Sequence, residues 1–162
     1  FDVEPEDIRV VVHPESIIHS MVEFADGAVI AQLGHPDMRE PIQYALAYPQ
    51  RLNLDNRKLD FAALGSLSFS APDTERFPAL GLAYEALRRG GNLACTMNAA
   101  NEIAVAAYLR EEISFYGISE LVAETMAGVE FVASPSLDDI FATNEAAKEY
   151  ASALIEKRKG RW

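Results

Sequence analysis

The residues of this sequence that could carry acid–base or metal chemistry gather in one stretch, Val10–Arg39. All three histidines of the chain, His13, His19 and His35, lie within it. An imidazole changes its charge near neutral pH, so it can exchange a proton with a substrate hydroxyl or bind a metal ion. The stretch is therefore the first candidate for a functional site.

The spacing of these histidines allows several kinds of site. His13 and His19 could join Asp37 in a metal triad, but the spacing matches no zinc pattern and no second acidic ligand is fixed nearby. We therefore expect no metal site made by this chain alone. His19 could also pair with Ser16 or Ser20 as a catalytic dyad, although no strained elbow or third orienting group supports one. Spacing alone favours a hydrogen-bonded surface histidine at position 19.

An Asp-Gly pair predicts the hairpin that would position His19. Segments of alternating apolar and polar residues flank Asp26-Gly27, the strongest short hairpin signal. With this pair at the two turn positions, His19 lies opposite Gly34 and beside the loop 35–38. One face of the hairpin would then be apolar and buried. That face carries Ile18, Val22, Phe24, Val29, Ala31 and Leu33, and the polar face carries His19, Met21, Glu23 and Gln32.

Further elements are predicted around the hairpin. The β-branched run 8–12 predicts a strand, and residues 37–48 predict a helix with Asp37 as N-cap and Glu40 at its third position. A lone hairpin is marginally stable in water, so we expect upstream sequence or a second copy of the chain to complete the sheet. An apolar hairpin with free edges is also a natural dimer surface.

The second half of the sequence has the period of helices. Residues 51–73 predict a linker. Four helices are expected after it, from Thr74 to about residue 90, over 94–110, over 119–129, and from Ser136 to about Arg158. A break is expected in the last helix near Thr143. Short connections favour an antiparallel bundle. The predicted fold class is therefore α+β, a partial sheet with a β-hairpin and one helix, then a linker and the bundle. Three polar residues could form a buried network in it, namely Asn98, Asn101 and Glu102.

The composition of the chain limits its partners and location. Of 162 residues, 49% are hydrophobic and 24% charged, which suits one or two compact cores. The net charge of −11 argues against nucleic acid and anionic membranes, since both favour clustered Lys and Arg. A single cysteine, Cys95, suits a reducing compartment. No signal peptide is visible and no apolar run approaches the roughly 20 residues of a membrane span. The start at Phe1 suggests a piece of a longer protein.

Long runs of the sequence resemble one enzyme family. They are HPESIIHSMVEFADGAVIAQLGHPDMREPI and MNAANEIAVAAYL, supported by the stretch Lys58–Pro72 and by SLDDIFATNEAAKE. Together they closely resemble the C-terminal part of 1-deoxy-D-xylulose-5-phosphate reductoisomerase, over essentially all 162 residues. This family is NADPH-dependent and serves the non-mevalonate (MEP) pathway of isoprenoid biosynthesis.

The resemblance implies that the chain is one part of a larger oxidoreductase. The family has a Rossmann-like NADPH domain, a central catalytic domain whose sheet also makes the homodimer, and a C-terminal bundle. Here residues 1–50 resemble the end of the catalytic and dimerisation domain, residues 51–73 the linker, and residues 74–162 the bundle. The nucleotide-binding glycine loop, the Asp-Ser-Glu metal motif and the substrate-contacting Asn-Lys-Gly segment are all missing. We therefore expect this piece alone to be inactive, with the upstream segments as its partners.

The resemblance also implies the reaction and its cofactors. The family converts 1-deoxy-D-xylulose 5-phosphate, a small phosphorylated sugar, into 2-C-methyl-D-erythritol 4-phosphate. A ketose phosphate becomes a branched aldehyde, which hydride from NADPH then reduces. A divalent cation (Mn²⁺, Mg²⁺ or Co²⁺) polarises the neighbouring oxygens. The expected location is the cytoplasm of a bacterium, or the plastid of a plant or alga.

Four residues of this chain match the family's site. His19 matches the catalytic histidine of the HPxSxIHS motif, and Ser16 of that motif lies near the substrate pocket. In the loop that matches GxPDMR, Pro36 lies near the substrate and Met38 packs near the nicotinamide, while His35 occupies the variable position and has no implied role. No residue of this chain is implied to bind the metal.

Two other functions remain open from the sequence. A non-catalytic dimerisation and scaffold module would explain the apolar hairpin and the missing ligands equally well. A sister oxidoreductase on the same scaffold would read its substrate through residues upstream of this chain. Convergence of His19, Ser16 and Met38 on one concavity would favour the enzyme over the module.

Overall fold

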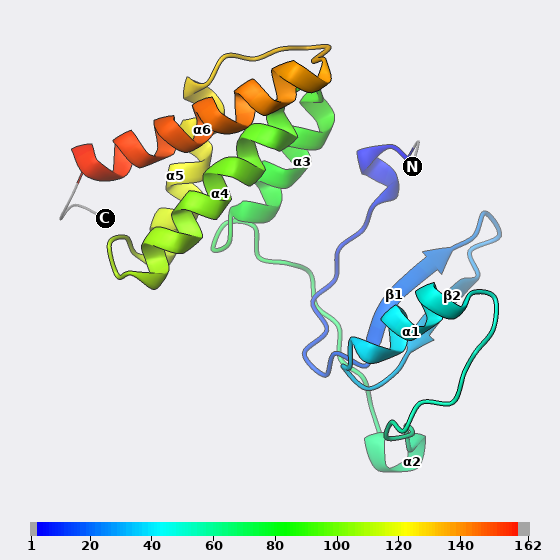
Figure 1. Ribbon diagram of the computed structural model, residues 1–162. Coiled ribbons are helices and arrows are strands. Elements are labelled where there is room, and N and C mark those ends of the chain that lie inside the picture. Colours follow the sequence, from blue (N-terminus) through cyan, green and yellow to red (C-terminus); the bar gives the residue numbers. More distant parts are fainter. Residues whose placement is uncertain (1–2, 159–162) are drawn as a thin grey trace. The chain divides into compact units, whose positions relative to one another are not determined.

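A computed structural model describes residues 3–158 of the chain, so the ends of the predicted outer domains, residues 1–2 and 159–162, lie outside it. Residues 10–72 form one compact unit, and the described residues before and after them form a second (Figure 1). The described elements are two antiparallel strands, six α-helices and one short 3-10 helix. They confirm the predicted α+β class.

The hairpin of the first unit consists of β1 (Ile18–Glu23) and β2 (Val29–Leu33). Its register differs by one residue from the prediction, because Val22 faces Ile30. The Phe24 N–H donates to the Ala28 carbonyl at 2.8 Å, so the turn holds three residues rather than two. Gly27 closes this turn in the left-handed region, with φ of 83°. Three-residue hairpin turns require such a residue, and an Asp-Gly pair serves them as well as the two-residue turns.

A β-bulge in the hairpin falls at His19. Ile18 pairs with Leu33 and Ser20 pairs with Gln32, so the register shifts between these pairs and leaves His19 as the extra residue. The predicted pairing of His19 with Gly34 is therefore wrong. Bulges bend a strand and re-aim a side chain, and they are frequent beside active sites.

Neither face of the hairpin is buried within residues 10–72. Val22 and Ile30 on one face are 58% and 64% exposed, and Val29 on the other is 55% exposed. The predicted contrast between a buried and an exposed face is therefore wrong for this chain. Two strands bury little apolar surface by themselves, so completion of the sheet by other sequence stays a prediction.

The elements predicted around the hairpin are only partly present. The predicted strand 8–12 is wrong, because this run makes one isolated bridge, between Val12 and Ser70. Helix α1 (Arg39–Ala47) forms as predicted, but its N-cap is Met38 without a side-chain hydrogen bond. Asp37 lies one residue earlier and accepts the Arg39 N–H at 3.0 Å. A short helix follows, α2 (Phe61–Leu64), capped by the side chain of Asp60.

The second unit is a helical bundle that also includes η1 (Pro5–Asp7). Its helices are α3 (Ala79–Arg89), α4 (Leu93–Leu109), α5 (Phe115–Gly128) and α6 (Leu137–Lys157). Helix α4 packs against α3, α5 and α6 (Figure 1). The alanines that allow this approach are completely buried, namely Ala99, Ala100, Ala104 and Ala107. No helix within residues 3–158 is both long and apolar enough to cross a membrane.

The predicted starts of two bundle helices are wrong, because α3 begins at Ala79 rather than near Thr74 and α5 begins at Phe115 rather than at Ser119. The side chain of Ser114 caps α5 by accepting the Gly117 N–H. Other helix ends follow the sequence signals. Gly90, in the left-handed region, ends α3 as predicted. Ser136 and Asp139 form a complete capping box at the start of α6. The predicted break near Thr143 is wrong, because α6 runs without interruption.

The buried polar residue of the bundle is Asn92, which the sequence analysis missed. Its Nδ2 donates to the Glu130 carbonyl at 2.9 Å and to Thr143 Oγ1 at 3.0 Å, and its Oδ1 accepts the Val132 N–H at 3.0 Å. Only 1% of Asn92 is exposed.

The network predicted at Asn98, Asn101 and Glu102 is not buried. All three residues lie on the exposed face of α4, where Asn98 donates to Glu102 at 3.1 Å. Glu102 also pairs with Lys148 of α6 at 3.0 Å. The prediction was wrong because the alanines, not these polar residues, face the other helices.

Candidate functional site

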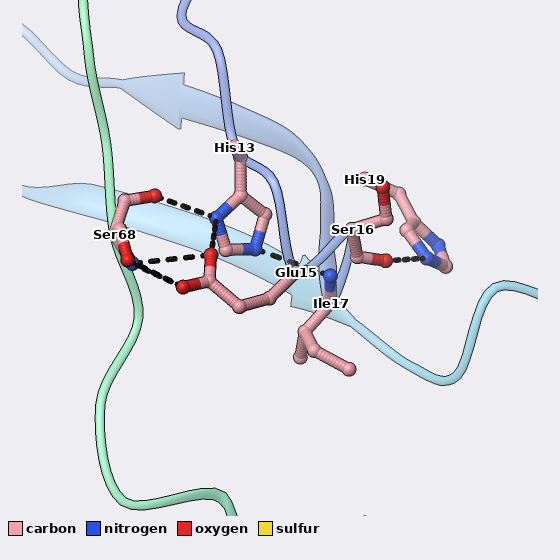
Figure 2. Close-up of polar contacts among 6 residues, drawn as sticks. All are labelled: His13, Glu15, Ser16, Ile17, His19 and Ser68. Carbon is pink, nitrogen blue, oxygen red and sulfur yellow. Dashed lines mark hydrogen bonds and ion pairs between the residues drawn. The ribbon is translucent and has the colours of Figure 1, made fainter.

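The imidazole of His19 is exposed at the bulge of β1 and is held by a backbone carbonyl (Figure 2). Its Nε2 lies 3.1 Å from the carbonyl oxygen of Ser16. A carbonyl can only accept, so Nε2 carries the hydrogen and the neutral ring keeps its lone pair on Nδ1. In this tautomer Nδ1 can accept a hydrogen bond or a proton from a hydroxyl group.

Ser16 holds this carbonyl in place through an uncommon backbone conformation. Its φ is 51°, in the left-handed region that few residues other than glycine adopt. The Ser16 N–H donates to the His13 carbonyl at 3.1 Å, which closes the turn. Strained backbone of this kind is concentrated at functional sites. Ser16 and His19 therefore meet through the carbonyl of Ser16 and not as a hydroxyl–imidazole dyad, and His19 is the hydrogen-bonded surface histidine that spacing alone favoured.

His13 fixes the other side of the same turn, a role the sequence analysis did not find. Only 7% of its side chain is exposed, and its ring stacks on Phe69 with centroids 4.9 Å apart. Its Nε2 accepts the Ile17 N–H at 3.1 Å, while its Nδ1 lies 2.9 Å from the Ser68 carbonyl. Both ring nitrogens are engaged in these bonds, which leaves neither for the metal triad considered above.

Glu15 completes the link to the segment around Ser68. Its carboxylate accepts the Ser68 N–H at 3.1 and 3.2 Å and also the Ser68 hydroxyl (Figure 2). The bond from the Ser68 hydroxyl is the main reason that the pKa of Glu15 lies below its usual value of 4.5. Residues 13–17 are therefore clamped to a segment more than fifty positions later. No local signal in the sequence indicates this contact.

The loop Gly34–Arg39 adjoins the same turn through the backbone of Ile17. The Gly34 N–H donates to the Ile17 carbonyl at 2.9 Å, so the two loops share one anchoring residue. Within this loop, hydrogen bonds from the Arg39 side chain and backbone lower the pKa of Asp37 to about 2. The two residues also form an ion pair of 2.5 Å.

Pro36 and Met38, the other two predicted site residues, lie exposed on this loop. The Met38 side chain is the more prominent, with 70% of the residue exposed. A large apolar side chain in this position is suited to be covered by another molecule or domain. The structure thus brings the two loops together by their backbones, with the candidate side chains on the surface.

A cavity of about 510 Å³ lies beside the second loop, and none of the four predicted residues lines it. Its lining includes Arg51, Arg57 and Lys58, and also His35, whose Nε2 is buried without a partner among the described residues. The predicted site is therefore an open surface and not this cavity. This cavity therefore does not provide the convergence of His19, Ser16 and Met38 that would favour the enzyme.

A metal centre has no support from the described residues. Within residues 3–158, no group of three or more His, Cys, Asp or Glu side chains could hold a metal ion.

The chain is an α+β protein in which a unit with a β-hairpin precedes a helical bundle. The candidate histidine, His19, lies at the bulge of this hairpin. A family model described as the DXP reductoisomerase C-terminal domain matches residues 33–150. The chain belongs to this family.

Known relatives of the chain are longer than the chain itself. It is 55% identical, over 157 residues, to the 1-deoxy-D-xylulose 5-phosphate reductoisomerase of Bacteroides fragilis, covering 97% of this chain and 40% of that protein. It is 56% identical over 155 residues to the enzyme of the same name from Bacteroides thetaiotaomicron, covering 96% and 40%. The chain thus spans about 40% of the length of these curated relatives.

Solved structures of the same name share the fold. The enzyme from Zymomonas mobilis, in complex with NADPH, aligns with a TM-score of 0.84 at 49% identity and covers 91% of this chain and 39% of that one. A DOX-P reductoisomerase in complex with magnesium aligns with a TM-score of 0.87 at 40% identity, covering 98% and 42%. Another, in complex with NADPH, fosmidomycin and magnesium, has a TM-score of 0.86 at 39% identity, covering 96% and 40%.

Proposed function

We propose that the chain is the C-terminal part of an NADPH-dependent reductoisomerase that converts 1-deoxy-D-xylulose 5-phosphate into 2-C-methyl-D-erythritol 4-phosphate. The observation that carries this proposal is the match of 97% of the chain, at 55% identity, to a relative of that name. The described loops support it, since they combine a constrained imidazole with an exposed thioether on adjoining segments. The pathway served would be isoprenoid synthesis by the non-mevalonate route.

In this proposal the chain supplies one wall of the active site. His19 is the catalytic residue, and its Nδ1 lone pair accepts a hydrogen bond from a substrate hydroxyl and holds that group in register. Ser16 and Pro36 lie next to the substrate. Met38 forms an apolar wall that orients the nicotinamide and excludes water. NADPH supplies the hydride when bound.

The remaining parts of the site belong to sequence upstream of this chain in our proposal. Those parts would bind the NADPH phosphates and a divalent cation, Mg²⁺, Mn²⁺ or Co²⁺, that polarises the substrate oxygens. The relatives solved with NADPH and with magnesium support this assignment. In this proposal the enzyme acts in the cytoplasm of a bacterium, which agrees with the bacterial sources of the relatives.

The hairpin supports a further part of the proposal, namely dimerisation through the sheet. Both of its faces are exposed and apolar in this chain, as Val22, Val29 and Ile30 show. Exposed strands with free edges pair readily with other strands. We propose that residues 1–50 complete the catalytic and dimerisation domain, that residues 51–73 link the domains, and that residues 74–162 form the C-terminal bundle.

The test of this function is turnover by the full-length protein. Purified full-length protein with 1-deoxy-D-xylulose 5-phosphate, NADPH and Mg²⁺ should consume NADPH in a substrate-dependent way and release 2-C-methyl-D-erythritol 4-phosphate, identified by mass spectrometry. The 162-residue chain under the same conditions should show no turnover. A full-length protein that dimerises but never consumes NADPH would instead support a scaffold module. Turnover of a different sugar phosphate alone would support a sister oxidoreductase.

A further inference from the structure

We propose that His13 is a positioning residue for His19. Fixed as the neutral tautomer with hydrogen on Nδ1, it holds the turn 13–17 in the conformation that directs the Ser16 carbonyl at the His19 ring (Figure 2). Its effect on catalysis rests on the proposed function. Its effect on the His19 tautomer does not.

The hydrogen bonds of His13 assign this tautomer. A backbone N–H can only donate, so the Ile17 N–H at 3.1 Å requires a lone pair on Nε2 of His13. A backbone carbonyl can only accept, so the Ser68 oxygen at 2.9 Å requires hydrogen on Nδ1. The two partners are consistent with one neutral ring and exclude the opposite tautomer.

The surroundings of His13 restrict its ring to this orientation. Burial of the side chain to 7% exposure and stacking on Phe69, with an interplanar angle of 17°, fix the plane of the ring. The Glu15 Oε2 lies 3.0 Å from Nδ1 and so reinforces the hydrogen on that nitrogen. Glu15 is in turn held by the Ser68 N–H. Orientation of one histidine by a carbonyl and a carboxylate is a usual way to fix its tautomer.

The turn transmits this constraint from His13 to the site. Ser16 stays at φ of 51° only while the surrounding bonds outweigh the strain of that conformation. The Ile17 N–H bond to His13 is one of these bonds, and it directly follows the Ser16 carbonyl in the chain. Without it the Ser16 peptide can relax, and His19 then loses the acceptor that keeps hydrogen on its Nε2. The Ile17 carbonyl also anchors Gly34, so relaxation reaches the second loop.

Two amide substitutions separate the two functions of the ring. The side-chain amide of Gln reaches the place of Nε2, so His13→Gln keeps an acceptor for the Ile17 N–H and loses the donor to Ser68. The shorter amide of Asn reaches the place of Nδ1, so His13→Asn keeps the donor and loses the acceptor. Both variants lack the aromatic ring that stacks on Phe69. Thr143→Val in the bundle, which removes one buried hydrogen bond, serves as a control for lowered stability.

The first measurement needs no variant. In full-length protein labelled with ¹⁵N-histidine, ring ¹H–¹⁵N correlation spectra should show hydrogen on Nδ1 of His13 and on Nε2 of His19. His13→Asn should change the His19 signals toward a mixture of tautomers, whereas His13→Gln should leave them as in the unmodified protein. An Nε2–H tautomer for His13, or His19 signals that stay the same in both variants, would overturn the proposal.

The second measurement is steady-state kinetics of the same full-length proteins. Misplacement of a catalytic group by about 1 Å costs up to about a hundredfold in rate, so His13→Asn should lower kcat by about ten- to a hundredfold with little change in KM. His13→Gln should recover most of that loss, and Thr143→Val should leave kcat unchanged. Equal losses in the two His13 variants, together with unchanged His19 spectra, would reduce His13 to a purely structural residue. If the unmodified protein has no activity, the proposed function fails, and the tautomer spectra still test the positioning.

Discussion

Replacement of Asn92 by alanine should destabilise the helical bundle by about 3 kcal/mol. The side chain makes three buried hydrogen bonds, to the Glu130 carbonyl, to Thr143 and from the Val132 N–H. Each buried hydrogen bond contributes about 1 kcal/mol net, and partners left without a bond in the interior add to the loss. Asn92→Ala removes all three at a residue that is only 1% exposed.

Native-state hydrogen exchange of the full-length protein measures this loss. The amides of α4 and α6 report the free energy of opening the bundle, independently of the other domains. Asn98→Ala makes the same substitution on the exposed face of the same helix and should change this free energy by less than about 0.5 kcal/mol. Thr143→Val removes one of the three bonds and should cost about 1 kcal/mol. A loss at Asn92 no larger than that at Asn98 would refute this explanation of the bundle.

Two further predictions concern the loops. Ser16→Gly should stabilise the protein by about 1 kcal/mol, because glycine adopts the left-handed conformation of this residue without the steric penalty. Thermal unfolding measures this change, and a destabilised variant would contradict the backbone strain assigned to Ser16. The pKa of Asp37 is about 2 in the folded protein, below the ordinary 3.8, so its bonds to Arg39 stabilise the loop above pH 3.8 and are lost as the pH falls through about 2. A pH titration of the Asp37 carboxyl ¹³C signal should have its midpoint near pH 2. A midpoint near pH 3.8 would contradict the contact between Asp37 and Arg39.

The four helices of the bundle could be predicted from sequence because their signals are local, although the starts of α3 and α5 and the break near Thr143 were predicted wrongly. Gly90 at the end of α3, the alanines of α4 and the Ser136 capping box each act within a few residues of the helix they define. The sequence pointed to Asn98, Asn101 and Glu102 as the buried polar residues, whereas the buried asparagine is Asn92, because its burial depends on tertiary contacts. Asn92 is buried by α6 and by the segment that contains Glu130 and Val132. The sequence around Asn92 does not indicate that these distant segments pack against it.

The hairpin and its site could be predicted only in outline. Asp26-Gly27 correctly marks the turn, but the same pair fits turns of two or three residues, and the choice shifts every cross-strand pair. The bulge at His19 appears only in the strand register, and the orientation of the His13 ring depends on a contact with Ser68, far along the sequence. The catalytic role that the family resemblance implies for His19 therefore stays a prediction, and the contacts of His13 on which our positioning proposal rests could not be predicted from the sequence.

The activity of a His19→Ala variant in the full-length protein tests most directly the claim that this chain contributes a catalytic imidazole. A positioned acid–base group contributes about a hundredfold or more to rate, so kcat should fall by at least that factor while the unfolding midpoint stays the same, since the side chain is exposed. An unchanged kcat would remove His19 from the active site and contradict the account.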